Sequence, residues 1–124
     1  MKIYFYILAV FVLCFSCAEA NKSSIGLVKT NQELYEAIKS AKPGDEIVLS
    51  NGVWKDVEIK FIALGTKGNP IILRAETEGE VFIEGVSNLA FGGEYLVVSG
   101  LHFRNGYSPS KNVIAFRIDE DSVA

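Results

Sequence analysis

Short apolar segments recur along this chain at nearly constant spacing. The segments fall into three classes. The first class is Ile47–Leu49, Ile71–Leu73 and Leu96–Val98, and the second is Val57–Ile59, Val81–Ile83 and Leu101–Phe103. The third class is Asn88–Phe91 and Asn112–Phe116. The starts lie 24 and 25 residues apart in the first class and 24 and 20 in the second, and 25 residues separate Phe91 from Phe116. Three strand classes at such spacing predict a solenoid with three strands per coil. The alternative is an all-β sandwich of short strands, in which similar spacings arise by chance.

Residues 94–106, with the sequence EYLVVSGLHFRNG, contain two of these strands in succession. We predict strands at Tyr95–Ser99 and Leu101–Arg104, separated only by Gly100. The second strand alternates apolar and polar residues, which is typical of a half-buried strand. Glycine between the strands indicates a bend where a side chain would obstruct the backbone. Such a pair cannot bury its apolar face alone, so other coils must stack on it.

One amphipathic helix is predicted before the strands. Thr30 and Glu33 fit a capping box, in which Thr30 accepts from the Glu33 amide and the Glu33 carboxylate accepts from the Thr30 amide. The helix runs to about Ala41, and its apolar face comprises Leu34, Ala37, Ile38 and Ala41. Because a parallel solenoid exposes the apolar end of its stack, we expect this helix to cover the first coil.

Residues 1–20 have the pattern of a secretory signal peptide, with Lys2 before the apolar run Ile3–Phe15. Cleavage after Ala18-Glu19-Ala20 would release a soluble chain. Alternatively, Cys17 would be the lipidated first residue of a bacterial lipoprotein. The two readings together predict an exported bacterial protein, in the periplasm, in the outer membrane as a lipoprotein, or outside the cell. Palmitate incorporation that survives Cys17→Ser would exclude lipidation. Residues 21–29 are read as a tether, and residues 30–124 as a helical cap followed by the first coils.

The charge and cysteine content restrict the function further. The formal net charge is −3, whereas nucleic-acid binders usually carry a clustered basic surface, so that class is disfavoured. Both cysteines, Cys14 and Cys17, precede residue 21, so no disulfide can form within residues 30–124. An exported domain without disulfides must be stabilised by a well-packed core.

Three segments together resemble polysaccharide lyase family 6, which contains chondroitinase B and many alginate lyases. They are NQELYEAIKSAKPGDEIVLSNGVWKDVEI, GTKGNPIILRAETEGEVFIEG and EYLVVSGLHFRNG, and the resemblance covers Asn31–Ala124. Tyr107-Ser108-Pro109 followed by Val113–Arg117 is more similar to the alginate-lyase members. The resemblance implies an all-β fold, a right-handed parallel β-helix, here of about three coils with an N-terminal capping α-helix. It also implies β-elimination on a uronic-acid polysaccharide.

Family members use a calcium ion held by Asn and Glu side chains, a Lys base and an Arg acid. Nothing in residues 1–124 matches those motifs, so we expect no catalytic residue and no metal ligand in this chain. Members are several times longer, so the chain is read as a truncated, N-terminal portion of an alginate lyase. We expect it to be inactive alone and to self-associate through its open last coil. The alternatives are a chondroitin or dermatan sulfate lyase, and a non-catalytic carbohydrate-binding or scaffold segment.

Candidate substrate contacts are Arg104, Tyr107 and Arg117. Arginine can bind the carboxylates of an acidic polymer bidentately, and tyrosine can stack on sugar rings, although ordinary solvated side chains give the same pattern. His102 is the only histidine and alternates with core positions, so it should be a plain surface residue. Trp54 could stack on sugar but is expected to cover the first coil.

Two further groups of polar residues receive structural readings. Asp119–Asp121 reads as a solvated turn, because an EF-hand loop needs a longer ligand series with a central glycine. Asn88, Asn105 and Asn112 fall at turns and could form a ladder of hydrogen bonds between coils.

Overall fold

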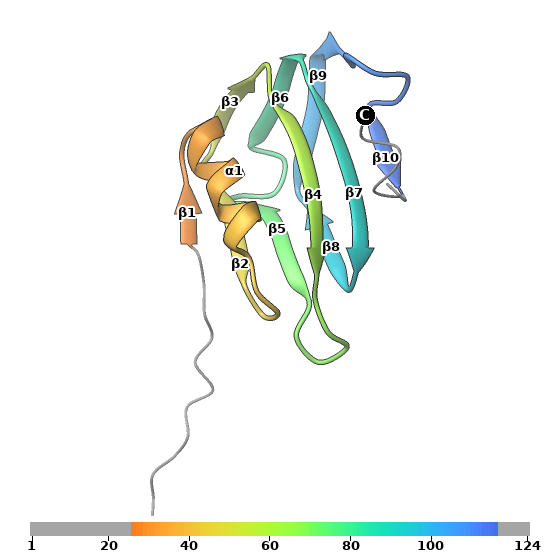
Figure 1. Cartoon of the computed structure of the whole chain (residues 1–124). Coiled ribbons are helices and arrows are strands. Elements are labelled where there is room, and N and C mark those ends of the chain that lie inside the picture. The colour runs from red at the N-terminus through yellow and green to blue at the C-terminus, as the bar shows by residue number, and fades with distance from the viewer. Residues whose placement is uncertain (1–25, 117–124) are drawn as a thin grey trace, which may run out of the picture.

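The computed structural model of the chain describes residues 26–116, which form ten strands and one helix (Figure 1). The elements are β1 Gly26–Val28, α1 Asn31–Ser40, β2 Glu46–Leu49, β3 Gly52–Lys55, β4 Glu58–Leu64, β5 Ile71–Ala75, β6 Val81–Val86, β7 Asn88–Glu94, β8 Leu96–Ser99, β9 Leu101–Tyr107 and β10 Ile114–Phe116. Among these residues, no helix is long and apolar enough to cross a membrane.

The strands form three parallel sheets that wind around a common axis. The sheet orders are β1-β2-β5-β8, β3-β6-β9 and β4-β7-β10, and every named pair is parallel. Each coil contributes one strand to each sheet, so β2-β3-β4, β5-β6-β7 and β8-β9-β10 are successive coils. The expected right-handed parallel β-helix of three coils is confirmed. The sandwich alternative is excluded because every strand pair is parallel, whereas a sandwich consists of two antiparallel sheets.

The register confirms part of the predicted repeat and corrects the rest. Ile83 pairs with Phe103 and Phe91 with Phe116, as the spacing predicted. In the first sheet, however, Ile47 pairs with Leu73 rather than Ile71. This two-residue difference keeps the same side chains inward, because side chains alternate with period two.

The prediction that Val57–Ile59 belongs to the same strand class as Val81–Ile83 and Leu101–Phe103 was wrong. Trp54 of β3 pairs with Ile83, whereas Ile59 of β4 pairs with Leu89 in a different sheet. The segment Gly52–Lys55 forms a strand where the sequence suggested a turn followed by a tryptophan. Gly52 adopts a φ of 119°, which fits the tight entry to such a strand.

Inward side chains of neighbouring coils stack in columns and make the core. Two columns are Trp54–Ile83–Phe103 and Phe61–Phe91–Phe116, in which the register places each residue over the next. Phe61 in the first coil is fully buried, whereas Phe116 in the third is 68% exposed. The column is therefore covered at the first coil and open at the third.

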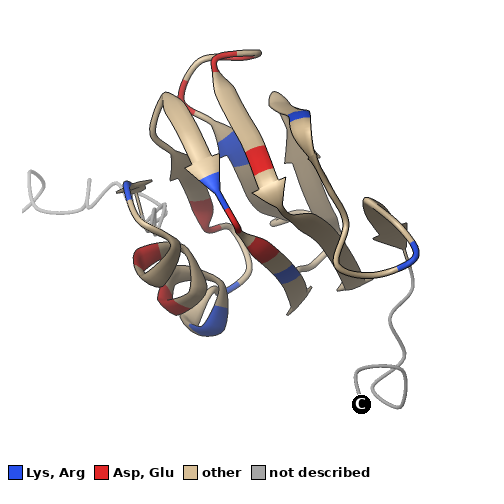
Figure 2. Cartoon of the chain, turned by 90° about the horizontal axis from the view of Figure 1, so that it is seen from above, with Lys and Arg blue, Asp and Glu red and all other residues tan. Residues whose placement is uncertain are grey.

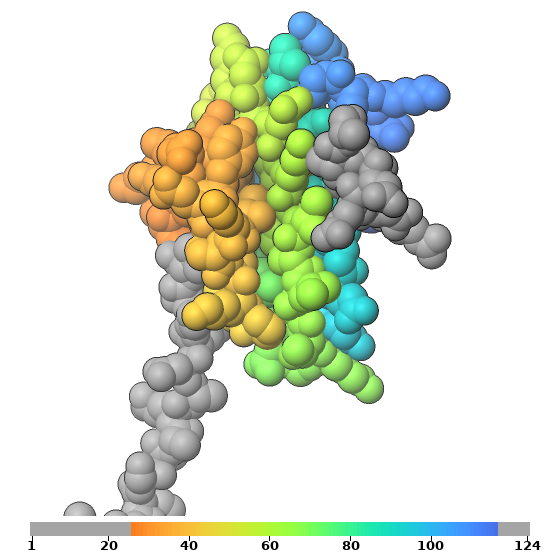
Figure 3. Space-filling model, in the orientation of Figure 1, coloured from red at the N-terminus to blue at the C-terminus, as the bar shows by residue number. Residues whose placement is uncertain are grey.

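Helix α1 closes the first-coil end of the stack. Leu34, Ala37 and Ile38 are buried there, as predicted, and the helix packs mainly against β4 and also contacts β1 and β2 (Figures 1 and 3). Thr30 accepts a hydrogen bond from the Glu33 amide at 3.2 Å. The Glu33 carboxylate accepts from the amide of Lys29 at 2.7 Å, not from Thr30, so the expected capping box is displaced by one residue.

The predicted asparagine ladder is wrong in its partners, although Asn88 and Asn105 do hydrogen-bond to a neighbouring coil. The Asn88 side chain donates to Ser110, and the Asn105 side chain donates to Glu84. Hydrogen bonds between coils also join Asn51 and Thr77, whose side chains bond at 2.9 Å while the Thr77 amide donates to the Asn51 side chain. This exchange fixes the turns that follow β2 and β5.

Several predictions fall outside the described residues. They concern the signal peptide, Cys14, Cys17, most of the tether, Arg117 and Asp119–Asp121. The predicted strand at Tyr95 is shifted, since Tyr95 has a φ of 51° and β8 begins at Leu96.

Candidate functional site

The outward face of the β3-β6-β9 sheet carries a cluster of polar and aromatic side chains. Ile83 and Phe103 point inward, so the neighbouring positions on each strand point out. Phe82 on β6 and His102 on β9 face each other. Glu84 and Arg104 are the next outward residues on the same two strands, and their side chains are hydrogen-bonded. The parallel register therefore brings together residues that are 20 apart in sequence.

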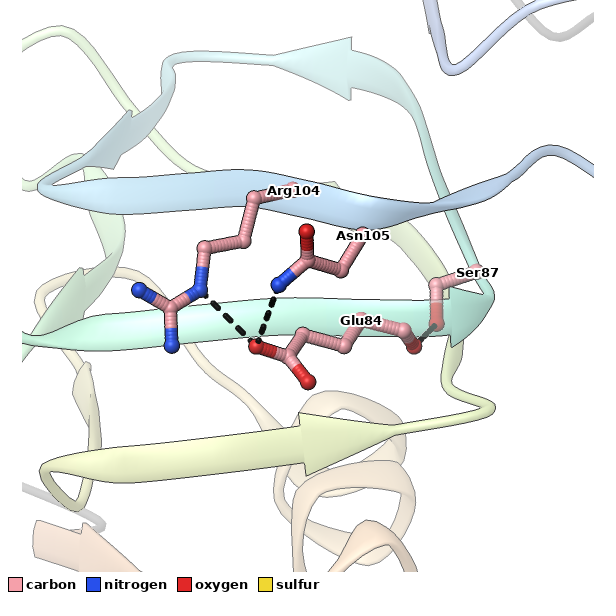
Figure 4. Close-up of polar contacts among 4 residues, drawn as sticks. All are labelled: Glu84, Ser87, Arg104 and Asn105. Carbon is pink, nitrogen blue, oxygen red and sulfur yellow. Dashed lines mark hydrogen bonds and ion pairs between the residues drawn. The ribbon is translucent and has the colours of Figure 1, made fainter.

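Arg104 is held on two sides. Its Nε donates to Glu84 Oε1 at 2.8 Å (Figure 4). Its guanidinium lies 3.6 Å from the centroid of the Phe82 ring. The arginine side chain remains 39% exposed. A cation over an aromatic face is attracted by the negative face of the ring, which adds to the ion pair. Arg104 is thus an ordered surface cation.

Asn105 reaches the same carboxylate from the next position on β9. Its φ of 49° reverses the usual alternation, so Arg104 and Asn105 both point toward Glu84 (Figure 4). The Asn105 amide donates to Glu84 Oε1 at 3.4 Å. The hydrogen bond from Arg104 is the largest influence that lowers the pKa of Glu84, and Asn105 acts in the same direction.

Ser87 fixes the end of β6 beside this cluster. Its hydroxyl donates to the Glu84 carbonyl at 2.7 Å and accepts from the amide of Val57 at 2.9 Å. Ser87 is buried, so both bonds are shielded from water. The Val86 amide also donates to Asp56 Oδ1 at 2.8 Å. The backbone on both sides of Gly85 is therefore held by the preceding coil.

A cavity of about 220 Å³ lies beside the cluster, at the end of β9. Arg104, Asn105 and Tyr107 line it together with Ser87 and Val113. Tyr107 is 69% exposed, so its ring is free to meet a ligand. Of the three predicted substrate contacts, the structure brings Arg104 and Tyr107 to one cavity. Aromatic, guanidinium and amide groups in one concave place are suited to an acidic sugar.

The other predicted residues have the structural roles expected of them. His102 is exposed, and its ring centroid lies 5.6 Å from that of Phe82. Trp54 is 4% exposed and donates from Nε1 to the Ser50 carbonyl at 2.9 Å, which excludes stacking on sugar. Glu84 and Phe82 were missed, and Asn105 was assigned only to a structural ladder of asparagines. The period-two alternation in Val81–Glu84 and the spacing of 20 contained the signal for Glu84 and Phe82.

Charged side chains occur on many elements of the described part of the chain. Both signs of charge are spread over strands and helix (Figure 2). Among residues 26–116, no group of three or more His, Cys, Asp or Glu side chains could hold a metal ion.

Comparison with known proteins places the chain in a family. A family model described as Chondroitinase B matches residues 28–124. A solved structure of the PL6 family alginate lyase AlyGC is 50% identical, with a TM-score of 0.75. The chain belongs to polysaccharide lyase family 6. The AlyGC match covers 80% of this chain and 14% of that one.

Two more structures from family 6 are similar to this chain. The PL6 family polysaccharide lyase Pedsa3628 from Pseudopedobacter saltans is 44% identical with a TM-score of 0.70, over 73% of this chain and 21% of that one. A mannuronic acid specific family 6 lyase from human gut microbiota is 29% identical with a TM-score of 0.62. That match covers 71% of this chain and 21% of that one. The chain thus spans about a fifth or less of the length of these structures. A search of curated proteins gives no match.

Proposed function

We propose that residues 26–116 are coils of an exported family 6 lyase that cleaves alginate by β-elimination. The observation that carries this proposal is the 50% identity to a structure described as an alginate lyase. The ordered Arg104 and exposed Tyr107 beside one cavity support an acidic polysaccharide as the ligand. Export through residues 1–20, with or without a lipid anchor at Cys17, belongs to the same proposal.

Elimination from a uronate needs a neutralised carboxylate, a base for the C5 proton and a proton for the departing C4 oxygen. Calcium would supply the neutralising charge in the whole enzyme. We place the calcium ligands, the base and the acid outside residues 26–116. The residues described here have a different part: Arg104 would bind a carboxylate of the polymer, and Tyr107 would stack on a neighbouring ring.

We expect a longer protein that contains these coils to release unsaturated uronate from alginate, measured as rising ultraviolet absorbance. The purified 124-residue chain should release none, because the groups that perform the elimination are not among its described residues. Dermatan sulfate serves as the second substrate, since the matching family model is described as Chondroitinase B. If only dermatan sulfate gives product, the substrate is dermatan sulfate and not alginate. Absence of product from both would favour a non-catalytic scaffold, and product from the isolated chain would refute its inactivity.

The third coil leaves apolar side chains uncovered. Ile114 and Phe116 are 45% and 68% exposed, and an open hollow of about 300 Å³ beside them is lined by Val98, Phe103 and other apolar groups. We propose that further coils cover this face in the whole lyase, and that a second copy covers it when the chain is isolated. Because α1 closes the opposite end, such association should stop at a dimer.

Light scattering with size-exclusion chromatography should therefore show a concentration-dependent dimer of the isolated chain. Phe116→Lys should shift it to monomer, because a charge would be buried in the interface. Leu64→Lys is the matched control, since Leu64 is also 68% exposed but lies on the outward side of the first coil. A monomeric mass for the unaltered chain would contradict this interface. Equal masses for the unaltered chain and Phe116→Lys would contradict it as well.

A further inference from the structure

The Arg104 guanidinium has only part of its hydrogen-bonding capacity in use. A guanidinium carries five N–H donors in a fixed planar fork. Nε–H is taken by Glu84, and the Phe82 ring covers one face of the plane. Within residues 26–116, the two terminal nitrogens of Arg104 donate to no partner. They form the edge of the fork that can bind a carboxylate bidentately.

We propose that Glu84 is a positioning residue, which holds Arg104 so that its terminal nitrogens are presented to a carboxylate of an acidic sugar. The proposal rests on the function proposed above and concerns the same cavity. Without Glu84, the long arginine side chain would sample many rotamers and would have to be ordered when the sugar binds. Ordering such a side chain in advance removes a cost of binding.

Glu84 is itself well fixed for this role. Its side chain is about one-fifth exposed, and Ser87 and Asp56 restrain the backbone at the end of β6. Asn105 donates to the same Oε1 atom as Arg104, so the carboxylate is held from two directions.

The charge state of Glu84 is stable over the working range. The hydrogen bond from Arg104 lowers the pKa of Glu84 below its ordinary value of 4.5. A lowered carboxylate pKa means that the ion pair is complete above the ordinary value and is lost only as the pH falls through the lowered one. Between about pH 5 and 8, where uronates are also ionised, the orientation of Arg104 should therefore not change.

A competing role predicts the opposite effect of removing Glu84. If the carboxylate only neutralised Arg104, its loss would strengthen the binding of an anionic sugar. Glu84→Gln and Glu84→Ala separate the two roles. Glutamine keeps an oxygen that can accept from Arg104 Nε and loses the charge, whereas alanine loses both.

The experiment uses the chain purified after export and mannuronate oligosaccharides as the probe, with affinity measured by calorimetry. We expect Glu84→Ala to bind about three- to tenfold more weakly than the unaltered chain, from the entropy of ordering one arginine. Glu84→Gln should keep at least half of the unaltered chain's affinity for the oligosaccharide. Glu80→Ala removes the same charge from an exposed position and is the control.

A second readout needs no sugar. In the unaltered chain and in Glu84→Gln, the Arg104 Nε–H should give a distinct, slowly exchanging NMR signal, and Glu84→Ala should lose it. An unchanged signal in Glu84→Ala, or affinity equal to or above that of the unaltered chain, would overturn the positioning role. If the signal depends on Glu84 but no uronate binds, the positioning of Arg104 stands, and the proposed role of Arg104 and Tyr107 as contacts for an acidic sugar fails.

Discussion

Phe61→Ala should lower the free energy of unfolding by about 3–5 kcal/mol, one of the two largest effects we expect in this chain. Phe61 is fully buried in the first coil, in the column that continues to Phe91 and Phe116. Alanine would leave a cavity inside the first coil, where the Phe61 ring now packs against neighbouring core side chains. The measurement is urea unfolding followed by circular dichroism.

Ile62→Ala is the control for this prediction, because Ile62 is the next residue on β4 and is 43% exposed. Its outward side chain should contribute less than about 1 kcal/mol. Equal losses for the two variants would mean that β4 does not alternate between core and solvent as described.

Gly93→Ala should have a comparable effect for a different reason. Gly93 has a φ of 123°, and a Cβ atom there would overlap the carbonyl oxygen of Ala63 in the coil beneath. Backbone atoms cannot move aside as a side chain can, so two coils must separate locally. We expect a loss of about 1–3 kcal/mol from overpacking, in addition to the strain of the positive φ.

Gly52→Ala isolates the close approach of the coils. Gly52 has a similar φ of 119°, but a Cβ atom there would meet nothing within 4 Å. Its substitution should therefore show the strain alone, and thermal unfolding should occur at a higher temperature than in Gly93→Ala. If Gly52→Ala were as unstable as Gly93→Ala, the tight contact between Gly93 and Ala63 would have no energetic role.

Much of the fold could be predicted because the apolar pattern repeats. The pairs Ile83–Phe103 and Phe91–Phe116 followed directly from spacing, and the apolar face of α1 followed from its period. The strand Gly52–Lys55 could not be predicted in this way, because it is short, begins with glycine and carries one inward tryptophan. Without it, the first coil was aligned with the wrong strand of the second.

The candidate site was predicted only in outline. Arg104 and Tyr107 were expected from their residue types, and both line the cavity. The partners of Arg104 depend on register and on local backbone. Glu84 reaches it because β6 and β9 pair across one coil, and Asn105 turns toward Glu84 through its positive φ. Neither feature can be deduced from residue type alone.

The stacking of parallel coils is the claim on which the site and the family assignment depend. Nuclear Overhauser contacts between backbone protons of the isolated chain test it most directly. We predict contacts that join Ile47 to Leu73 and Leu73 to Val98, in parallel register through three coils. Contacts that instead join consecutive strands such as β5 and β6 in antiparallel register would contradict the fold, and with it the placement of Arg104 beside Glu84.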